Sequence, residues 1–162
     1  MIFAVTGHRP SKLKDLGYTY DLRDPKWQDL KTKIKKFIDQ YSCEEFYTGM
    51  ALGVDQIAAL AIIELNEEGK NIRLHAAIPC ANQEKKWPYA SQMLYKAILS
   101  KADTISFVSN EEYTPWCMQK RNEFMVDHAD MILAIWDGSS GGTKNCVDYA
   151  EKKNKLIHKM RP

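Results

Sequence analysis

Short apolar runs alternate along this chain with longer stretches in which apolar residues recur at helical spacing. The short runs predict buried strands, because they are too short for typical helices. These strands are expected at residues 2–5, 46–47, 72–78, 104–108, 131–136 and 156–158. The longer stretches predict helices at residues 27–41, 54–68, 89–102 and 117–128 and a further helix after Thr143. Such alternation predicts an α/β fold with a mostly parallel central sheet and helices on both faces, because crossovers between parallel strands are nearly always right-handed.

The length and composition predict a single domain over residues 1–162. The net charge of +2 argues against general nucleic-acid affinity, although it does not exclude a local basic patch. The four cysteines contain no CxxC pair, so neither a metal site nor a disulfide framework is expected. No signal peptide or membrane span is evident, and reduced thiols then predict a cytoplasmic protein.

Three of the predicted strands end in glycine together with polar donors. These strand ends are residues 6–10 (TGHRP), 48–55 (TGMALGVD) and 137–143 (DGSSGGT). Ligands of open α/β proteins bind at the carboxyl ends of the strands. If the three strands are neighbours, their loops line one crevice, and this convergence is the main reason to expect a nucleotide-like ligand.

The last of these loops has the arrangement of a phosphate site. A strand, a turn containing Gly138, Gly141 and Gly142, and then a helix place free backbone N–H groups and a positive helix end against an anion. Glycine suits this place because a side chain would block the approach of a ligand to the backbone. The alternative is a plain strand-to-helix turn in which Gly141 and Gly142 serve only the turn.

The two earlier loops offer groups for the rest of such a ligand. His8 and Arg9 supply donors suited to phosphate or carboxylate, unless both are merely solvated. Asp55 either caps the helix that follows it or accepts hydrogen bonds from ribose hydroxyls. The candidate binding residues of these two loops are Thr6, Gly7, His8, Arg9, Gly49, Gly53 and Asp55.

Other segments add candidates of their own. Residues 11–24 form a polar loop long enough to serve as a lid or a ligand wall. Trp87 or Trp116 would stack on a base, and for Trp87 core packing is the alternative. Arg121, next to Asn122 on the helix at 117–128, is the charge of that helix that we expect to serve a ligand.

These motifs resemble those of the YpsA family, which belongs to the SLOG superfamily of Rossmann-like proteins. The resemblance runs nearly end to end and is carried by TGHRP (6–10), GMALGVD (49–55), Pro79, Trp87, WDG (136–138) and GGT (141–143). It implies a Rossmann-like three-layer sandwich that binds a nucleotide or nucleotide-derived ligand such as an ADP-ribose derivative. It also implies a homo-oligomer, because superfamily relatives often pair as dimers. It brings no established reaction, cofactor or metal.

One group of superfamily relatives, the LOG-type phosphoribohydrolases, implies an enzyme instead. These enzymes cleave the base from cytokinin nucleotides and carry an Arg on the helix before a Pro-Gly-Gly-x-Gly-Thr-x-x-Glu loop. Arg121 resembles that Arg. Asn145 and Cys146 stand where the hydrolase has its carboxylate, which weakens the hypothesis of a nucleotide N-glycosidase. Asp137 or Asp148 would have to take the place of that carboxylate.

A second group, the DprA type, loads recombinase onto single-stranded DNA. Such binding requires a basic groove with stacking aromatic side chains. Lys85, Lys86 and Trp87 could supply one, as could Trp116 with Lys120 and Arg121. The near-neutral net charge places this hypothesis third, after ligand binding and hydrolysis.

Overall fold

The computed structural model describes residues 1–162 and contains one six-stranded sheet in the order β4-β3-β2-β1-β5-β6. Every pair of neighbouring strands is parallel, so the predicted mostly parallel sheet is parallel throughout. The strands are β1 Ile2–Gly7, β2 Glu45–Thr48, β3 Arg73–Ile78, β4 Thr104–Phe107, β5 Met131–Ile135 and β6 Leu156–Met160.

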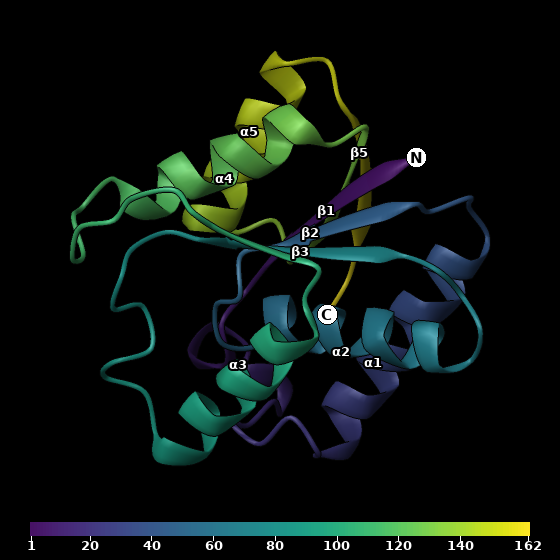
Figure 1. Ribbon diagram of the computed structural model, residues 1–162, viewed down its shortest axis with the longest axis horizontal. Coiled ribbons are helices and arrows are strands. Elements are labelled where there is room, and N and C mark those ends of the chain that lie inside the picture. Colours follow the sequence, from purple (N-terminus) through teal and green to yellow (C-terminus); the bar gives the residue numbers. More distant parts are fainter.

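Five α-helices cover the two faces of this sheet and complete the predicted three-layer Rossmann-like sandwich (Figure 1). The helices are α1 Pro25–Asp39, α2 Val54–Glu67, α3 Tyr89–Lys101, α4 Cys117–His128 and α5 Gly142–Lys152. Helices α1 to α3 lie on one face, and α4 and α5 pack together on the other. The covered face changes because the chain passes outward from β1 to β4 and then returns to β5 on the far side of β1. None of these helices combines the length and the apolar character needed to cross a membrane.

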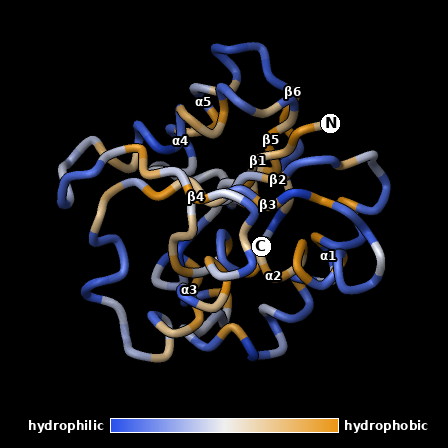
Figure 2. The backbone as a smooth tube through the Cα atoms, in the orientation of Figure 1, coloured by the Kyte–Doolittle hydropathy of each residue, from blue (hydrophilic) through white to orange (hydrophobic).

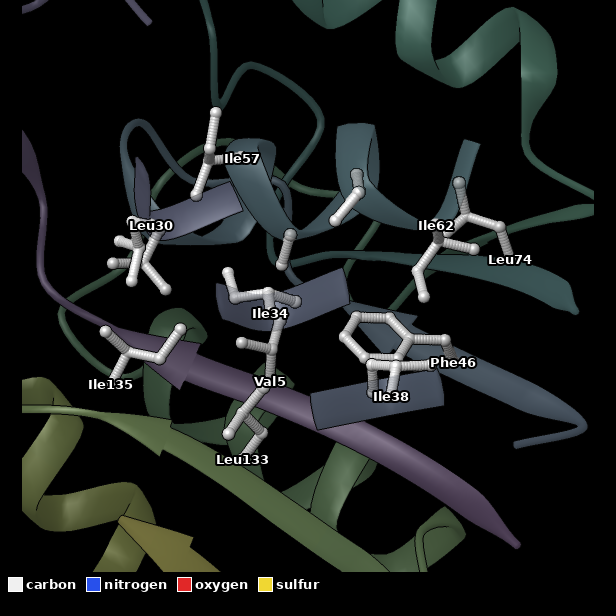
Figure 3. Packing of buried hydrophobic residues seen from close by; sticks show 14 of the residues in the cluster. Val5, Leu30, Ile34, Ile38, Phe46, Ile57, Ile62, Leu74, Leu133 and Ile135 are labelled. Carbon is white, nitrogen blue, oxygen red and sulfur yellow. The ribbon is translucent and has the colours of Figure 1, made fainter. Parts of the chain in front are cut away.

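The main core fills the space between the sheet and helices α1 and α2. Figure 3 shows sheet residues such as Val5, Phe46 and Leu133 packed against Ile34 of α1 and Ile57 of α2. Apolar residues accordingly gather on the strands and on the inner helix faces, while the outer loops are hydrophilic (Figure 2). Helix α2 is the most deeply buried, because α1 and α3 flank it on both sides.

The segment 11–24 differs from the polar loop that the sequence predicts. It contains two short 3-10 helices, η1 Pro10–Lys12 and η2 Lys14–Leu16. Leu13, Tyr18 and Leu22 are buried in the main core. Single apolar residues without a helical or strand period anchor this segment, which is why the pattern of the sequence did not reveal the anchoring. The segment is therefore a wall fixed to the core rather than a free lid.

The strand order decides where the three glycine-containing loops meet. Strand β1 pairs with β2 on one side and with β5 on the other. The loops that follow these three strands are therefore neighbours at the carboxyl edge of the sheet. The direction of the chain also reverses at this point, which is where open α/β sheets form their ligand crevice.

Candidate functional site

A cavity of about 310 Å³ lies at this edge, between the loops after β1, β2 and β5 and the start of α4. It is lined by Thr6, Gly7, His8, Arg9, Ser11, Lys12, Ala51, Asp55, Met118, Arg121, Asn122, Gly142 and Thr143. We call it the basic cavity, because three cationic side chains, Arg9, Lys12 and Arg121, face a single carboxylate, Asp55. The excess of positive charge suits an anionic ligand.

Arg121 is a buried cation whose partners leave part of its donor capacity free. Its side chain donates from Nη1 to the Gly49 carbonyl and from Nε to Asn122 Oδ1 at 2.9 Å, and only 5% of the residue is exposed. No carboxylate lies within 4.0 Å of it, and Nη2 has only the weak acceptor Met118 Sδ at 3.8 Å. A side chain at Gly49 would collide with the guanidinium group. Glycine at position 49 therefore makes the room that Arg121 occupies.

Asp55 in the first turn of α2 stabilises the loop after β2 and also faces the basic cavity. Its Oδ2 accepts a hydrogen bond from the Ala51 N–H at 3.2 Å, and Thr48 Oγ1 donates to its carbonyl at 2.9 Å. Burial raises the pKa of the Asp55 carboxyl, and the nearby Arg121 charge opposes that rise. Burial likewise lowers the pKa of Arg121, against the attraction of Asp55. The carboxylate therefore stabilises the loop before α2 rather than capping the helix amides, because the N-cap of α2 is Gly53 and no side-chain cap hydrogen bond is present. Its position is compatible with the ligand-binding interpretation.

Helix α5 directs its amino terminus at the basic cavity. The helix begins at Gly142, and its first-turn N–H groups have no acceptor within the helix. A Cβ at Gly142 would meet no atom within 4 Å, although the residue lines the cavity. The space beside the Gly142 backbone is therefore open to the cavity, as close approach of an anion to this helix end requires.

Asp137 and Lys12 hold the loop before α5 in place. His8 Nε2 and Asp137 Oδ1 lie 2.8 Å apart, and the Ser139 N–H donates to the same oxygen at 2.9 Å. Hydrogen bonds from Ser139 and then from His8 hold the pKa of Asp137 well below its usual range. Lys12 Nζ donates to the Ser140 carbonyl. Asp137 is a lining residue of none of the larger cavities, so it positions this loop from outside.

A second cavity, of about 640 Å³, adjoins the basic cavity and shares Arg9 and Met118 with it. It is lined by Arg9, Cys80, Asn82, Gln83, Lys85, Lys86, Trp87, Glu112, Tyr113 and Met118. Trp87 packs edge-on against Tyr95 with ring centroids 5.3 Å apart and is half-buried, so it contacts the core and lines this cavity at the same time. Trp116 lies outside both cavities, with 58% of its surface exposed.

Four other predicted residues line neither of these two cavities: Gly53, Pro79, Gly138 and Gly141. Gly53 has a φ of +89°, and a side chain there would press on the His8 carbonyl and on Pro10. It is needed for the close contact between the loops after β1 and β2. Lys12 is a lining residue that the sequence did not single out. Its charge lies among other polar residues of the segment 11–24, and no motif marks it.

The residues considered for the place of the hydrolase carboxylate do not line the basic cavity. Asp148 pairs with Lys144 at 2.6 Å on the exposed side of α5. Cys146 is buried, and burial raises the pKa of its thiol to about 11. Asp55 is therefore the only carboxylate in the basic cavity. No group of three or more His, Cys, Asp or Glu side chains is placed to hold a metal ion.

Two solved structures resemble the fold. One is DNA processing protein A (DprA) from Helicobacter pylori, described for its single-stranded DNA binding mode, with a TM-score of 0.64 and 16% identity. The other is DprA from Streptococcus pneumoniae, with a TM-score of 0.68 and 16% identity. The alignments cover 98% and 97% of this chain but only 64% and 49% of those chains, and at such identity they show a common fold alone.

Comparison of sequences adds the family. The uncharacterized SPbeta prophage-derived protein YoqJ of Bacillus subtilis (strain 168) is 38% identical over 154 residues, which are 86% of this chain and 90% of YoqJ. A UPF0398 protein of Bacillus thuringiensis (strain Al Hakam) is 27% identical over 157 residues, which are 96% of this chain and 85% of that protein. The model of the YspA SLOG family (YpsA) matches residues 3–161. The resemblance noted from the motifs is therefore confirmed, and the chain belongs to the YpsA family of SLOG proteins.

Proposed function

We propose that this protein binds a nucleotide or a nucleotide-derived ligand, such as an ADP-ribose derivative, in the basic cavity. The observation that carries the proposal is the convergence of Arg9, Lys12 and Arg121 on the open amino terminus of α5. A phosphate is the group that such a combination of cations and free N–H groups recognises best.

Each of the two adjoining cavities would bind a different part of the ligand. A phosphate would accept hydrogen bonds from the first-turn N–H groups of α5 and from Arg121. Asp55 would accept from ribose hydroxyls, because its carboxylate faces the same cavity. A base would lie in the second cavity against Trp87 or Tyr113, on the far side of Arg9.

A thermal-shift titration with AMP, ADP, NAD, ADP-ribose and its cyclic forms tests the proposal. A ligand that binds only the folded protein stabilises it by about 2.7 kcal/mol at a hundred times its Kd. We expect at least one of these compounds to raise the melting temperature, and Gly142→Leu to abolish the shift by filling the open space before α5. Gly142→Ala is the matched control, because a lone Cβ meets no atom there. Equal shifts in wild type and Gly142→Leu would contradict the phosphate assignment.

The same samples decide between binding and hydrolysis. The supernatant of each mixture is analysed for free base by chromatography. A thermal shift without base release supports a sensing or sequestering protein. A shift with base release would favour the nucleotide N-glycosidase, with Arg121 and Asp55 as the groups to replace first.

Single-stranded DNA is a second candidate ligand. Lys85, Lys86, Trp87 and Tyr113 line one cavity, which combines basic and aromatic side chains in the way that single-strand binding uses. DprA of Helicobacter pylori, which shares the fold, is known for its single-stranded DNA binding mode. Fluorescence anisotropy of a labelled dT oligonucleotide, with ADP-ribose as competitor, tests whether the two ligands share the site.

A further inference from the structure

A third cavity, of about 500 Å³, shares no lining residue with the two described above. It is formed between the β1–α1 connection at residues 20–23, the first turn of α2 and the first turns of α3. In Figure 1 the purple β1–α1 connection and the teal helix α3 lie side by side on the lower face of the sheet. Its walls follow β1, β2 and β3, so this cavity also opens at the carboxyl edge of the sheet, but with a lining of its own.

Gln56 is the first sign that this cavity holds a ligand. The residue is 1% exposed and lines the cavity, yet its Nε2 has no hydrogen-bond partner. A buried polar group left without a partner costs about 1–3 kcal/mol. A bound ligand or water that accepts from this amide would remove that cost.

The amino terminus of α3 is the second sign. This helix of 13 residues is preceded by Pro88, which makes no side-chain hydrogen bond to it, and its first turn contains no acidic residue. Ala90 and Ser91 of that turn line the cavity. Their N–H groups have no intrahelical acceptor, and the helix end carries partial positive charge, so both favour an anion.

The charge and polarity of the remaining lining residues indicate which kind of anion the cavity suits. Arg23 binds Asp21 through two hydrogen bonds of 3.0 Å, so this pair adds no net charge. Leu22 and Leu94 supply apolar surface. A helix end with about half a unit of positive charge and no unpaired cation suits a singly charged group better than a dianionic phosphate. The apolar surface suits a ligand with an apolar body.

We propose that this cavity binds a small carboxylic acid with an apolar body. The carboxylate accepts hydrogen bonds from the N–H groups of Ala90 and Ser91 and from the Gln56 amide. The apolar body packs against Leu22 and Leu94. The site is independent of nucleotide binding in the basic cavity.

Benzoate, titrated into ¹⁵N-labelled protein and followed by two-dimensional NMR, tests the proposal. We expect saturable shifts of the Ala90 and Ser91 amides and of the Gln56 side-chain amide. Gln56→Met keeps the shape of the side chain but removes the amide, and we expect it to weaken benzoate binding at least tenfold. Gln83→Met is the matched control, because Gln83 is also buried but lines the second cavity. Shifts that do not saturate, or equal affinity in wild type and Gln56→Met, would overturn the proposal.

Two further measurements separate the ligand classes and protect against a folding artefact. Inorganic phosphate is expected to shift the Gly142 and Thr143 amides instead, and tighter binding of phosphate than of benzoate at Ala90 and Ser91 would overturn the choice of a carboxylate. The melting temperature of ligand-free Gln56→Met should equal or exceed that of wild type, because the substitution removes an unpaired buried amide. A marked fall in that temperature would show that Gln56 serves the fold rather than a ligand.

Discussion

At the scale of single residues, the basic cavity depends on a buried arginine and on the glycine that makes room for it. Arg121 donates to the Gly49 carbonyl, and a Cβ on Gly49 would collide with the guanidinium group. The position of the Arg121 charge is therefore set by a residue that contributes no side chain. A substitution at Gly49 should therefore lower ligand affinity by displacing the Arg121 side chain.

The first prediction concerns Gly49→Ala. The new methyl group displaces the guanidinium group, so we expect nucleotide affinity to fall about tenfold or more, which corresponds to about 1.4 kcal/mol. Arg121→Gln should cause a similar loss, and the double variant should lose little more than either single one, because both changes remove one interaction. Calorimetric titration measures all three. Gly69→Ala is the control, since Gly69 lies in open space with a φ of +105° and should affect stability without affecting affinity.

The second prediction concerns Asp55 and pH. Burial raises the pKa of this carboxyl, so the folded protein takes up a proton at a higher pH than the unfolded chain does. The contribution of Asp55 to stability is therefore greatest below the unfolded pKa of about 4 and is lost as pH rises through the raised folded value. Asp55→Asn removes this dependence, and its free energy of unfolding should fall less than that of wild type as pH rises.

Urea unfolding of wild type and Asp55→Asn at a series of pH values between 3 and 8 provides the measurement. Asp148→Asn serves as control, because Asp148 is exposed and pairs only with Lys144 on the surface of α5. Parallel pH profiles for wild type and Asp55→Asn would contradict the prediction.

At the scale of secondary-structure elements, the segment between β1 and α1 joins the cavity wall to the core. Lys12 of η1 lines the basic cavity and donates to the Ser140 carbonyl of the loop before α5. The next residue, Leu13, is fully buried in the main core. The position of the Lys12 charge in the basic cavity therefore depends on how the neighbouring residue, Leu13, packs in the core.

The third prediction follows from this coupling. Leu13→Ala should destabilise the protein by about 2–5 kcal/mol, as loss of a buried leucine side chain usually does. It should also weaken nucleotide binding, because η1 and Lys12 lose their anchor. Leu16→Ala is the matched control in the same segment, since 44% of Leu16 is exposed and its removal should change stability by about 0.5 kcal/mol or less. Urea unfolding of both variants measures the change in stability, and calorimetric titration measures the change in nucleotide affinity.

The sequence predicted the elements well for a physical reason. Buried strands and amphipathic helices follow from the local spacing of apolar residues, so strands such as β1 and β5 can be predicted from their own residues alone. The anchoring of the segment 11–24 was not, because Leu13, Tyr18 and Leu22 follow no period. The contribution of Lys12 to the basic cavity depends on that anchoring, so it could not be predicted either.

At the scale of the whole molecule, strand order converts scattered motifs into one site. The sequence does not show that β1 lies between β2 and β5. The convergence of the three loops could therefore be predicted only on the assumption that their strands are neighbours. The motifs nevertheless contain most of the residues that line the basic cavity, because a parallel sheet brings all its carboxyl ends to one edge. The cationic side chains of Arg9, Lys12 and Arg121 concentrate charge at this edge, although the net charge of the chain is only +2.

This uneven charge distribution leads to the last prediction, which separates a small ligand from single-stranded DNA. A DNA strand would have to follow both adjoining cavities, and its phosphates would need Lys85 and Lys86, which lie beyond Arg9. A compact nucleotide gains its phosphate contacts within the basic cavity. The double variant Lys85→Glu/Lys86→Glu should therefore weaken binding of a dT oligonucleotide about tenfold or more and reduce the salt dependence of that binding. Its effect on ADP-ribose should stay below about fivefold at physiological salt, where exposed charges are screened beyond about 8 Å.

Fluorescence anisotropy at several salt concentrations measures both ligands. The matched control is Lys152→Glu/Lys153→Glu at the exposed carboxyl end of α5, which makes the same change in net charge away from both cavities. If the control weakens DNA binding as much as Lys85→Glu/Lys86→Glu does, the oligonucleotide responds only to overall charge and no specific groove exists. If ADP-ribose binding is lost together with DNA binding, the two ligands depend on the same lysines. The division of the ligand between a phosphate site at α5 and a base site beyond Arg9 would then be wrong.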